Sequence, residues 1–580
     1  AFLVPYAIIG YDVIWSAVRN IIRGQVFDEN FLMALATVGA LAIQEYPEAV
    51  AVMLFYQVGE LFQSLAVGKS RKSIAALMNI RPEIAVVLRG GTELTVPPEE
   101  VSIGEEIIIR PGEKIPLDGV ITEGTTTVNT SALTGESLPI DKGISDSVAS
   151  GTVNLSGLIR VKTTCAYEDS TVAKILELVE NSAAKKAKTE RFITRFAKYY
   201  TPCVVLMAVL LAFIPPLLFS QNFSEWLNRA LIFLVVSCPC ALVISVPLSF
   251  FGGIGGASKE GILIKGANYL ESLGKVKTVV FDKTGTLTEG TFSVTAVHPE
   301  TVSEAELLDI AATAESYSNH PIARSIVDAH GGHIEQRRIG KIKELAGLGV
   351  KAEIDNRQIH VGNSKLMEQI GAKWHYCHKT GTIVHIAVEN EYMGHIVISD
   401  TIKSDAQKAV TELKQLGISK TVMLTGDTQK VAETVASTLG IDTTYAELLP
   451  EQKVAEVERL LHETNLGTLV FVGDGVNDAP VLARADVGIA MGALGSEAAI
   501  EAADIVLMDD RPTKIARAIL LSRKTMRIVY ENIVFALSVK AIVLVLGALG
   551  IANMWLAIFA DVGVMILAIL NAMRTLRIQK

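Results

Sequence analysis

Residues 276–288 read VKTVVFDKTGTLT, an apolar run that ends in an acidic turn containing glycine. The run 278–281 has the composition of a buried strand, and Asp282 follows it directly. A carboxylate in this position can attack phosphorus and form an aspartyl phosphate. Lys283, Thr284 and the backbone amides that follow can neutralise phosphate charge. The stretch therefore predicts a phosphoryl-transfer site with Asp282 as its nucleophile.

Two further strand-like runs end in similar turns. Residues 421–424 lead into Thr425-Gly426-Asp427, and residues 469–472 lead into Gly473-Asp474-Gly475-Val476-Asn477-Asp478. Helical stretches separate the runs, which is typical of a parallel α/β sheet whose site lies at the carboxyl ends of its strands. A segment of about 291–396 interrupts the pattern and is predicted to be an inserted domain.

These turns supply different groups to the predicted site. Asp474 and Asp478 are hard oxygen ligands suited to Mg²⁺, and we expect Asp282 and Thr284 to bind the same ion. Thr425 and Asp427 offer a hydroxyl and an amide to phosphate, and Lys453 adds a positive charge. The sequence contains no Gly-x-x-x-x-Gly-Lys-Ser/Thr loop, which excludes a P-loop NTPase.

The composition indicates a multidomain membrane protein. The chain has 580 residues, too many for one core, and half of them are hydrophobic, with a mean hydropathy of +0.37. A net charge of −9 and a pI of about 5.7 argue against nucleic-acid binding. The chain starts at Ala1, already within an apolar run and without Met, so we expect further sequence upstream.

Seven apolar stretches approach the length of about 20 residues that crosses a bilayer. They are roughly 1–18, 29–45, 47–68, 199–219, 228–250, 528–550 and 552–573. Lys and Arg flank the two soluble blocks between them, about 69–190 and 255–522, whereas the opposite loops are short and poor in both. By the positive-inside rule, both blocks are cytoplasmic. The odd number of spans places the N-terminus outside, consistent with a missing first helix.

A metal site is predicted inside the membrane. Cys238 and Cys240 flank Pro239, which removes one helix hydrogen bond and opens the helix locally. Thiolates there favour Zn²⁺, Cd²⁺, Pb²⁺ or Cu⁺. Lys540 and Asp561 lie at comparable depth, where a charge costs roughly 2.5–3.5 kcal/mol on insertion scales. We expect both cysteines and Asp561 to bind metal, and Lys540 to act as a counter-charge that pairs with Asp561 in the empty site.

Two further groups of potential ligands lie outside this set. Glu60, in the third apolar stretch, is another acid within the membrane, and we expect it to be a transient ligand on the release path. The spacing of His375, Cys377 and His378 is compatible with a metal cluster. We interpret those three residues as an exposed turn with no further ligand nearby.

Taken together, the motifs resemble those of P-type ATPases over essentially the whole chain. Residues 282–286 (DKTGT) resemble the family's phosphorylation signature, 134–137 (TGES) its actuator loop, and 425–427 and 473–480 its hinge motifs. The resemblance implies that Mg·ATP phosphorylates Asp282. It also implies that Glu136, in the Thr134-Gly135-Glu136-Ser137 loop, positions the water that hydrolyses the aspartyl phosphate.

The family's fold is then expected here. It comprises an α-helical transmembrane bundle, a mostly-β actuator domain, an α/β phosphorylation domain of the haloacid-dehalogenase-like type, and an α/β nucleotide-binding insert. The β-branched residues and glycine turns of the first soluble block agree with the β domain. The expected boundaries are 1–68, 191–254 and 523–580 for the transmembrane helices, 69–190 for the actuator domain, 255–290 and 397–522 for the phosphorylation domain, and 291–396 for the insert.

The insert carries residues that resemble a nucleotide site. Ser318-Asn319-His320-Pro321 and Gly347-Leu348-Gly349 resemble the His-Pro and Gly-x-Gly elements of the heavy-metal branch of the family. The resemblance implies that His320, Gly347 and Gly349 line the adenine pocket of ATP, and that Glu315 and Gly362 complete it. The family usually has Glu where Asn319 stands, so no role is carried over to that position.

The residues in the last two apolar stretches narrow the choice of the transported metal ion. Lys540 and the Asp-x-Gly at Asp561 resemble the zinc, cadmium and lead branch, and the copper-branch patterns are absent from these stretches. Two thiolates and one carboxylate suit a divalent borderline ion. We predict an ATP-driven exporter of Zn²⁺, Cd²⁺ or Pb²⁺, monomeric in the lipid bilayer of a bacterial inner membrane. The alternatives are a Cu⁺-exporting P-type ATPase, a membrane-anchored HAD-type phosphatase, and a metal-gated channel or sensor.

Overall fold

The computed structural model describes residues 2–23, 29–78, 82, 84–130, 139–174, 187–219, 222–237, 239–318, 320–334, 339–345, 348–377, 381–463, 467–474, 478–492 and 501–576. The chain divides into two compact units. One is formed by residues 1–275 and 517–580, and the other by residues 276–516. The first unit contains the first soluble block and most of the apolar helices, and the second contains the sheet that carries Asp282.

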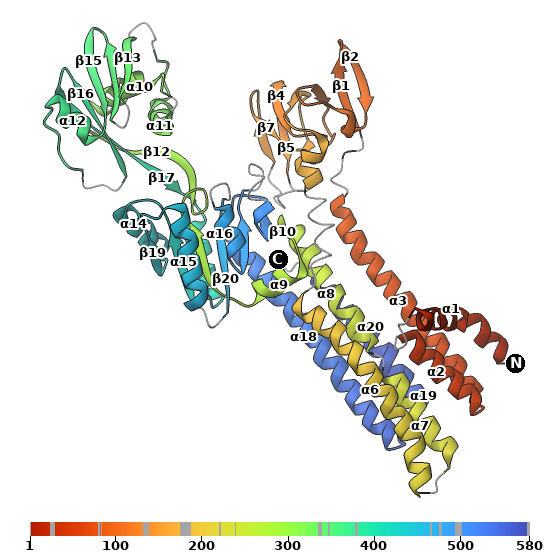
Figure 1. The fold of residues 1–580 in the computed structure, drawn as a ribbon. Coiled ribbons are helices and arrows are strands. Elements are labelled where there is room, and N and C mark those ends of the chain that lie inside the picture. The colour runs from red at the N-terminus through yellow and green to blue at the C-terminus, as the bar shows by residue number, and fades with distance from the viewer. Residues whose placement is uncertain are drawn as a thin grey trace. The chain divides into compact units, whose positions relative to one another are not determined.

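Helices occupy all seven apolar stretches (Figure 1). They are α1 (Leu3–Ile22), α2 (Glu29–Ala42), α3 (Tyr46–Met78), α6 (Lys188–Phe219), α7 (Phe223–Val236), α8 (Cys240–Ser258), α18 (Thr513–Ala548), α19 (Met554–Ile558) and α20 (Val564–Ala572), with the short turns η4 (Phe559–Gly563) and η5 (Met573–Leu576) in the last stretch. Among the described residues, four stretches are long and apolar enough to cross a membrane: Tyr199–Phe219, Phe223–Ser258, Thr513–Ala548 and Met554–Leu576. The helix Asn30–Ala42 is apolar but shorter, and α1 and α3 are not among the four.

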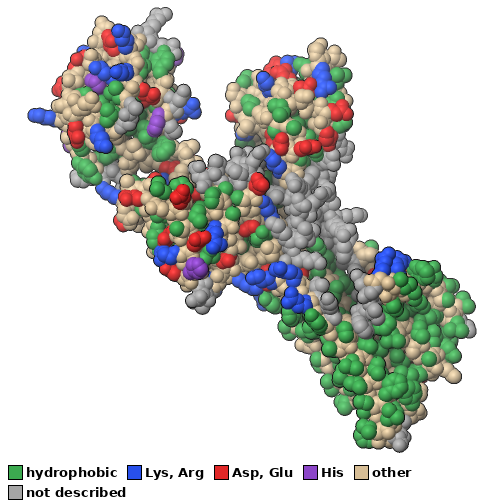
Figure 2. All heavy atoms as spheres, in the orientation of Figure 1, with side chains coloured by type: hydrophobic (Ala, Val, Ile, Leu, Met, Phe, Trp, Pro, Cys, Tyr) green, Lys and Arg blue, Asp and Glu red, His purple; other side chains and the backbone are tan. Residues whose placement is uncertain are grey.

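Apolar side chains lie on both the inner and the outer faces of these helices, as a lipid environment allows. Figure 2 shows hydrophobic side chains gathered over the helical part of the first unit. Leu206, Leu210 and Leu217 are exposed on the outer face of α6. Gly59 of α3 permits close packing, because a Cβ there would lie 2.6 Å from Met565 Cε.

The first soluble block is mostly β, as its composition predicted. One antiparallel sheet has the strand order β2–β1–β3–β9–β4–β7, and a smaller one has the order β6–β5–β8. The strands are β1 (Ala85–Arg89), β2 (Thr92–Val96), β3 (Glu106–Ile109), β4 (Gly119–Glu123), β5 (Thr126–Asn129), β6 (Ile140–Lys142), β7 (Ser147–Val148), β8 (Val153–Asn154) and β9 (Ile159–Thr163). Ile107, Ile109, Ile159 and Val161 form the core between them. Strand β10 (Ile262–Ile264) and helix α9 (Ala267–Gly274) follow α8 in the same unit.

The second unit contains a parallel sheet with the strand order β22–β21–β20–β11–β18–β19. The strands are β11 (Val276–Asp282), β18 (Lys420–Leu424), β19 (Thr443–Tyr445), β20 (Thr468–Gly473), β21 (Val487–Ala490) and β22 (Ile505–Leu507), and the helices are α13 (Ala406–Gln415), α14 (Gln429–Leu439), α15 (Pro450–Glu463) and α16 (Ala479–Arg484). The central strands are nearly continuous apolar runs because both faces of the sheet are covered. Their carboxyl ends share one edge, where the predicted catalytic residues lie.

An antiparallel sheet is inserted between β11 and β18, with the strand order β12–β17–β16–β15–β14–β13. The strands are β12 (Thr288–Pro299), β13 (Ile339–Leu345), β14 (Gly349–Ile354), β15 (Arg357–Gly362), β16 (Thr382–Val388) and β17 (Glu391–Ile402). Helices α10 (Glu304–Glu315), α11 (Pro321–His330) and α12 (Ser364–Ile370) accompany it. Because β12 and β17 are long and pair with each other, the sheet extends a few residues beyond the expected range 291–396 on both sides.

Candidate functional site

Asp282 is the last residue of β11, at the carboxyl edge of the parallel sheet. β11 lies between β18 and β20, with Asp282 beside Leu424 and Phe281 beside Val472. The side chains before Asp282 are almost all buried, and Asp282 itself is only 5% exposed. The apolar run therefore fixes the strand, and the first polar residue after it becomes a nearly buried carboxylate.

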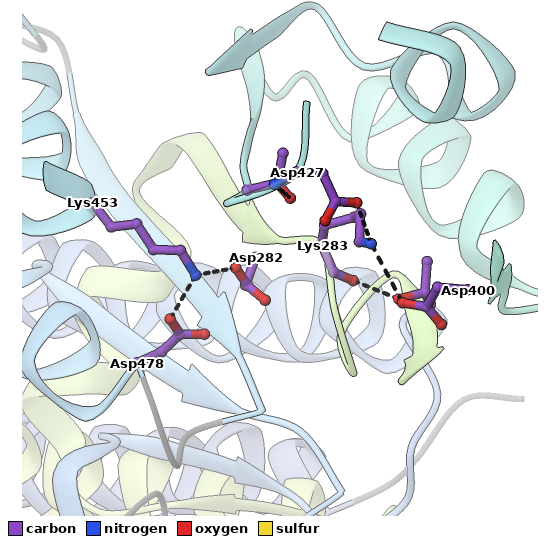
Figure 3. Close-up of polar contacts among 8 residues, drawn as sticks. Asp282, Lys283, Asp400, Asp427, Lys453 and Asp478 are labelled. Atoms are coloured by element: carbon purple, nitrogen blue, oxygen red, sulfur yellow. Dashed lines mark hydrogen bonds and ion pairs between the residues drawn. The ribbon is translucent and has the colours of Figure 1, made fainter. Parts of the chain in front are cut away.

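Lys453 joins this carboxylate to a second one (Figure 3). Its Nζ donates to Asp282 Oδ1 at 2.5 Å and to Asp478 Oδ1 at 3.0 Å. Burial raises the pKa of Asp282 to about 7; the charge of Asp478 adds to this rise and Lys453 opposes it. Burial lowers the pKa of Lys453, but the two carboxylates outweigh burial and raise it. Lys453 is thus held as an ammonium ion between two acids.

Lys283 makes a second ion-pair network beside the first. Its Nζ donates to Asp427 Oδ2 at 2.6 Å and lies 3.5 Å from Asp400 Oδ2 (Figure 3). Thr288 Oγ1 also donates to Asp400. Asp427 was predicted from the turn after β18, whereas Asp400 belongs to β17 and lies outside the predicted motifs. The register of β12 against β17 brings Asp400 to this site.

Lys403 is a further residue that the sequence reasoning missed. Its Nζ donates to the Gly285 carbonyl oxygen at 2.7 Å and to Asp510 Oδ1 at 2.6 Å. The Lys403 side chain is only 6% exposed, so its charge is held against the turn that follows Asp282. Only the position of Asp400 and Lys403 in the sequence could have identified them as site residues. Both lie where the chain returns from the insert to the parallel sheet.

The turn after Asp282 fits a phosphate group. Gly285 has a φ of +70°, and a Cβ there would lie 2.4 Å from Asp474 Oδ2, so the position requires glycine. Thr286 Oγ1 is buried and has no hydrogen-bond partner among the described residues. An unsatisfied buried hydroxyl is a donor suited to a phosphate oxygen. Thr284 is exposed at the rim of the turn.

The acids around Asp282 fit a magnesium ion. The carboxylates of Asp478 and Asp474 lie close enough to Asp282 to raise the pKa of Asp282. Carboxylate oxygens are the protein ligands that Mg²⁺ usually takes, together with oxygens of the bound phosphate. Thr425 is 2% exposed, and its Oγ1 accepts from the Asp427 amide at 3.1 Å, which orders the turn after β18.

The predicted nucleotide residues come from helices α10 and α11 and from strands β14 and β15 of the insert. Glu315 ends α10 and is buried, and burial, with the charge of Glu344, raises its pKa to about 7. His320 is the N-cap of α11, where its Nδ1 accepts from the Ile322 amide at 3.3 Å. The exposed His320 ring lies at the surface of the insert.

Gly349 and Gly362 form a cross-strand pair between β14 and β15. A Cβ on Gly349 would lie 2.1 Å from the Val361 carbonyl oxygen, and one on Gly362 would lie 2.1 Å from the Leu348 carbonyl oxygen. Close backbone packing therefore requires both glycines, independently of any contact with adenine.

Several predicted residues lie outside the described part of the chain. They are Thr134, Gly135, Glu136, Cys238, Gly347 and Asn477, together with Asn319 and His378. The actuator loop that contains Glu136 falls between β5 and β6.

The membrane site contains a buried ion pair. Lys540 Nζ donates to Asp561 Oδ1 at 2.7 Å and to the Val236 carbonyl oxygen at 2.9 Å. Lys540 and Asp561 are each 5% exposed. The pair expected between them is therefore present. Asp561 lies in the π-helical turn η4, an irregularity that frequently marks functional positions in helices.

The break predicted at Pro239 separates α7 from α8. α7 ends at Val236 and α8 begins at Cys240, with Pro239 as its N-cap. Cys240 is 5% exposed, and the thiolate is the form of its side chain that would bind metal. A cavity of about 180 Å³ reaches the break and is lined by Pro239, Lys540, Tyr200 and apolar side chains.

The first helices add polar groups near this bundle core. Glu60 of α3 is half-buried, one residue after the glycine that packs against Met565. Asp12 of α1, which the sequence reasoning did not single out, accepts from Gln57 Nε2 at 2.7 and 2.9 Å. An acid in the middle of an apolar helix was the signal that could have identified Asp12.

Comparison with known proteins assigns both soluble blocks to the domains expected from the sequence. Residues 276–486 match the family model of haloacid dehalogenase-like hydrolases, and residues 79–180 match the model of the P-type ATPase actuator domain. The first range contains Asp282, Lys453 and Asp478, and the second contains the sheets β1–β9.

Relatives and solved structures cover the whole chain. The chain is 56% identical to a cadmium, zinc and cobalt-transporting ATPase of Bacillus subtilis, over 100% of this chain and 83% of the relative. It is 54% identical to a zinc-transporting ATPase of Synechocystis, over 99% of this chain and 80% of the relative. A crystal structure of a zinc-transporting PIB-type ATPase in its E2·Pi state is 35% identical, with a TM-score of 0.65, and the match covers 99% of this chain and 95% of that one. The chain therefore belongs to the heavy-metal-transporting P-type ATPases.

Proposed function

We propose that this ATPase exports a divalent borderline metal ion, Zn²⁺ or Cd²⁺, with Pb²⁺ as a further substrate. One observation carries the metal assignment, namely the buried pair of Lys540 and Asp561 beside the helix break at Cys240. The names of the relatives, which include zinc, cadmium and cobalt transporters, support the same class of ion.

The geometry at Asp282 supports a mechanism of phosphoryl transfer. A carboxylate oxygen of Asp282 forms a bond to the γ-phosphorus of ATP, and the bond between that phosphorus and the ADP oxygen breaks. Lys453 and Lys283 neutralise the charge that develops on the transferred phosphoryl group. The hydroxyls of Thr286 and Thr425 donate hydrogen bonds to its oxygens. Mg²⁺ held by Asp474 and Asp478 would supply further charge neutralisation.

Hydrolysis of the aspartyl phosphate resets the pump. Glu136 positions the attacking water, in keeping with the family's actuator loop, and Asp282 is released as a carboxylate. Adenine would contact Glu315, His320, Gly347, Gly349 and Gly362 of the insert, as the resemblance to the heavy-metal branch implies. Asn477 completes the acidic turn after β20.

Metal transport depends on exchange at Asp561. The incoming ion takes Asp561 and the thiolates of Cys238 and Cys240 as ligands, which releases Lys540 as an internal counter-charge. Phosphorylation of Asp282 then selects which side of the membrane the site faces. Glu60 of α3 receives the ion on the release path.

The setting proposed for this cycle is a bacterial inner membrane, with both soluble blocks in the cytoplasm and the pump acting as a monomer. The Lys and Arg that flank the soluble blocks support this orientation.

ATP hydrolysis against a panel of metals tests the proposal. The purified, reduced protein in lipid is expected to show activity stimulated by Zn²⁺, Cd²⁺ and Pb²⁺. Cys240→Ala should lose that stimulation, whereas Cys203→Ala, at an exposed position on α6, should keep it. Stimulation by Cu⁺ alone would instead assign the chain to copper transport, and activity indifferent to metal would favour a phosphatase.

A further inference from the structure

Three histidines form a row across adjacent strands of the inserted sheet. In the register of the sheet, His298 of β12 pairs with His395 of β17, and His395 pairs with His385 of β16. Residues directly opposite one another in an antiparallel sheet place their side chains on the same face. The ring centroids of His298 and His395 are accordingly 5.0 Å apart, and those of His385 and His395 are 5.8 Å apart.

Cys377 approaches this row from the segment between α12 and β16. One nitrogen each of His298 and His395 and the Cys377 sulfur all lie within 4.8 Å of one another. Cys377 and His395 are each 7% exposed, and Cys377 is a free thiol. The sequence expectation of an exposed turn with no further ligand was therefore wrong, because strand pairing brings ligands from far along the chain.

Two ring nitrogens at this place are buried and unsatisfied. His298 Nε2 and His395 Nε2 have no hydrogen-bond partner among the residues that the structure describes. Buried polar atoms are nearly always paired, so two unpaired nitrogens facing one thiol indicate a missing ligand rather than ordinary packing. Their lone pairs and the thiolate are donors of the kind that zinc-like ions take.

A second layer of residues holds His395 in the orientation for binding. Its Nδ1 lies 3.1 Å from the Tyr392 hydroxyl, which in turn lies 2.9 Å from His385 Nδ1. If Nδ1 of His395 donates to this hydroxyl, the hydroxyl donates to His385, and the lone pair of His395 Nε2 stays available. A hydrogen bond from the other ring nitrogen is the usual support of a ligating histidine.

We propose that Cys377, His298 and His395 bind one divalent borderline ion of the Zn²⁺, Co²⁺ and Cd²⁺ class, with water as the fourth ligand. Two imidazoles and one thiolate suit these ions. In tetrahedral zinc sites the ligand atoms are about 3.5 Å apart. The three atoms here need to approach by on the order of 1 Å, within the range of side-chain rotation.

This site is separate from the one that transports metal. Its ligands belong to the unit of residues 276–516, whereas Cys240, Lys540 and Asp561 belong to the other unit. The ion would hold β12, β17 and the segment before β16 together. The same row continues through Gly362, opposite His385, to Gly349, which places the bound ion on the sheet that carries the proposed adenine pocket.

A cobalt titration of the full chain tests the proposal. The variant Cys238→Ala/Cys240→Ala, reduced and in detergent, removes the membrane thiolates. Co²⁺ is then expected to produce sulfur-to-cobalt charge-transfer absorption and the visible bands of tetrahedral Co²⁺, saturating at one ion per chain. Added Zn²⁺ should abolish both signals. Absence of the charge-transfer absorption in this variant would overturn the proposal.

Further variants in the same background identify the ligands. Cys377→Ser should abolish the charge-transfer absorption, and His298→Gln, at a partly exposed position, should weaken Co²⁺ affinity at least tenfold. Cys165→Ser and Cys203→Ser remove the other free thiols and should change nothing. His360→Gln is the matched control, since His360 is a buried histidine of the same sheet outside the cluster. Absorption that survives Cys377→Ser, or affinity unchanged in His298→Gln, would contradict the assignment.

Discussion

The phosphorylation site and the membrane site are both built on a lysine that contacts a buried aspartate. Lys453 Nζ lies 2.5 Å from Asp282 and also contacts a second carboxylate, Asp478. Lys540 Nζ lies 2.7 Å from Asp561, and its other partner is a neutral backbone carbonyl. The two lysines therefore differ in how much negative charge surrounds them.

The charge count shows what each site accepts. Asp282, Asp474 and Asp478 with Lys453 leave two negative charges, which a divalent Mg²⁺ balances. In the membrane, Lys540 and Asp561 cancel each other, so the net charge depends on the thiolates of Cys238 and Cys240. These two thiolates leave two negative charges, which a divalent ion balances and Cu⁺ does not. The phosphorylation site therefore carries excess negative charge before it binds a cation, whereas the membrane pair stays neutral until metal separates it.

The largest expected effect is at the nucleophile. Asp282→Asn removes the oxygen that attacks phosphorus, so phosphoenzyme and transport should both fall below detection. Acid-stable labelling of the protein by ATP carrying radioactive γ-phosphate measures this loss. Glu289→Gln, at an exposed position on β12, should label normally. Labelling or metal transport that persists in Asp282→Asn would contradict the proposed cycle, and a metal-gated channel would behave in that way.

The next largest effect is expected at the Lys540–Asp561 pair in the membrane. Asp561→Asn leaves Lys540 buried without its counter-charge, which should cost about 3–5 kcal/mol of stability and abolish metal-stimulated ATP hydrolysis. The double variant Asp561→Asn/Lys540→Met removes both charges and should regain much of the stability but none of the activity. Thermal unfolding in detergent and hydrolysis assays give the two readouts. A double variant no more stable than Asp561→Asn would show that the two charges are not coupled.

Lys283 should have a smaller effect, because Lys453 also neutralises the phosphate. Lys283→Met is expected to lower kcat by roughly 10²–10³-fold, the loss typical of one charge-stabilising donor. Steady-state ATP hydrolysis at saturating metal measures it, and Lys283→Arg, which keeps the charge, should retain more activity than Lys283→Met. Equal activity of Lys283→Met and the unaltered chain would remove Lys283 from the catalytic set.

Glu315 differs from both aspartates, because it is a buried carboxyl with no lysine among the groups that shift its pKa. Its pKa is raised from 4.5 to about 7. Between these two pH values the carboxyl is therefore ionised in the unfolded chain but mostly protonated in the folded state. Stability should therefore fall as the pH rises from about 4.5 to 7, by at most about 3 kcal/mol. Glu315→Gln should remove this loss, stabilising the insert at pH 8 and leaving its stability at pH 4 unchanged. Thermal melts at both pH values measure the effect, and an equal change at both would contradict the raised pKa.

The features that local sequence determines were predictable. The apolar run before Asp282 predicted a buried strand, and the acidic turns after β18 and β20 predicted the neighbours of Asp282. Lys540 and Asp561 were predicted to pair because isolated charges within apolar helices need partners. The mostly-β first block followed from its β-branched composition.

The features that depend on strand register were not predictable. Asp400 and Lys403 reach the phosphorylation site only because β12 and β17 pair along their length. Cys377 was interpreted as part of an exposed turn. His298 lies 79 residues before Cys377 and His395 lies 18 residues after it, and both meet Cys377 only through the same strand pairing. Gly349 and Gly362 carry a packing requirement that a motif match alone did not reveal.

ATP-dependent metal uptake into vesicles tests whether metal passes through the site of the Lys540–Asp561 pair. The protein is reconstituted with its soluble blocks outward, and ATP-dependent accumulation of radioactive zinc is measured for the unaltered chain, Asp282→Asn and Asp561→Asn. The account predicts accumulation by the unaltered chain and none by either variant. Zinc accumulation by Asp561→Asn at the rate of the unaltered chain would contradict the claim that metal passes through the site of the Lys540–Asp561 pair.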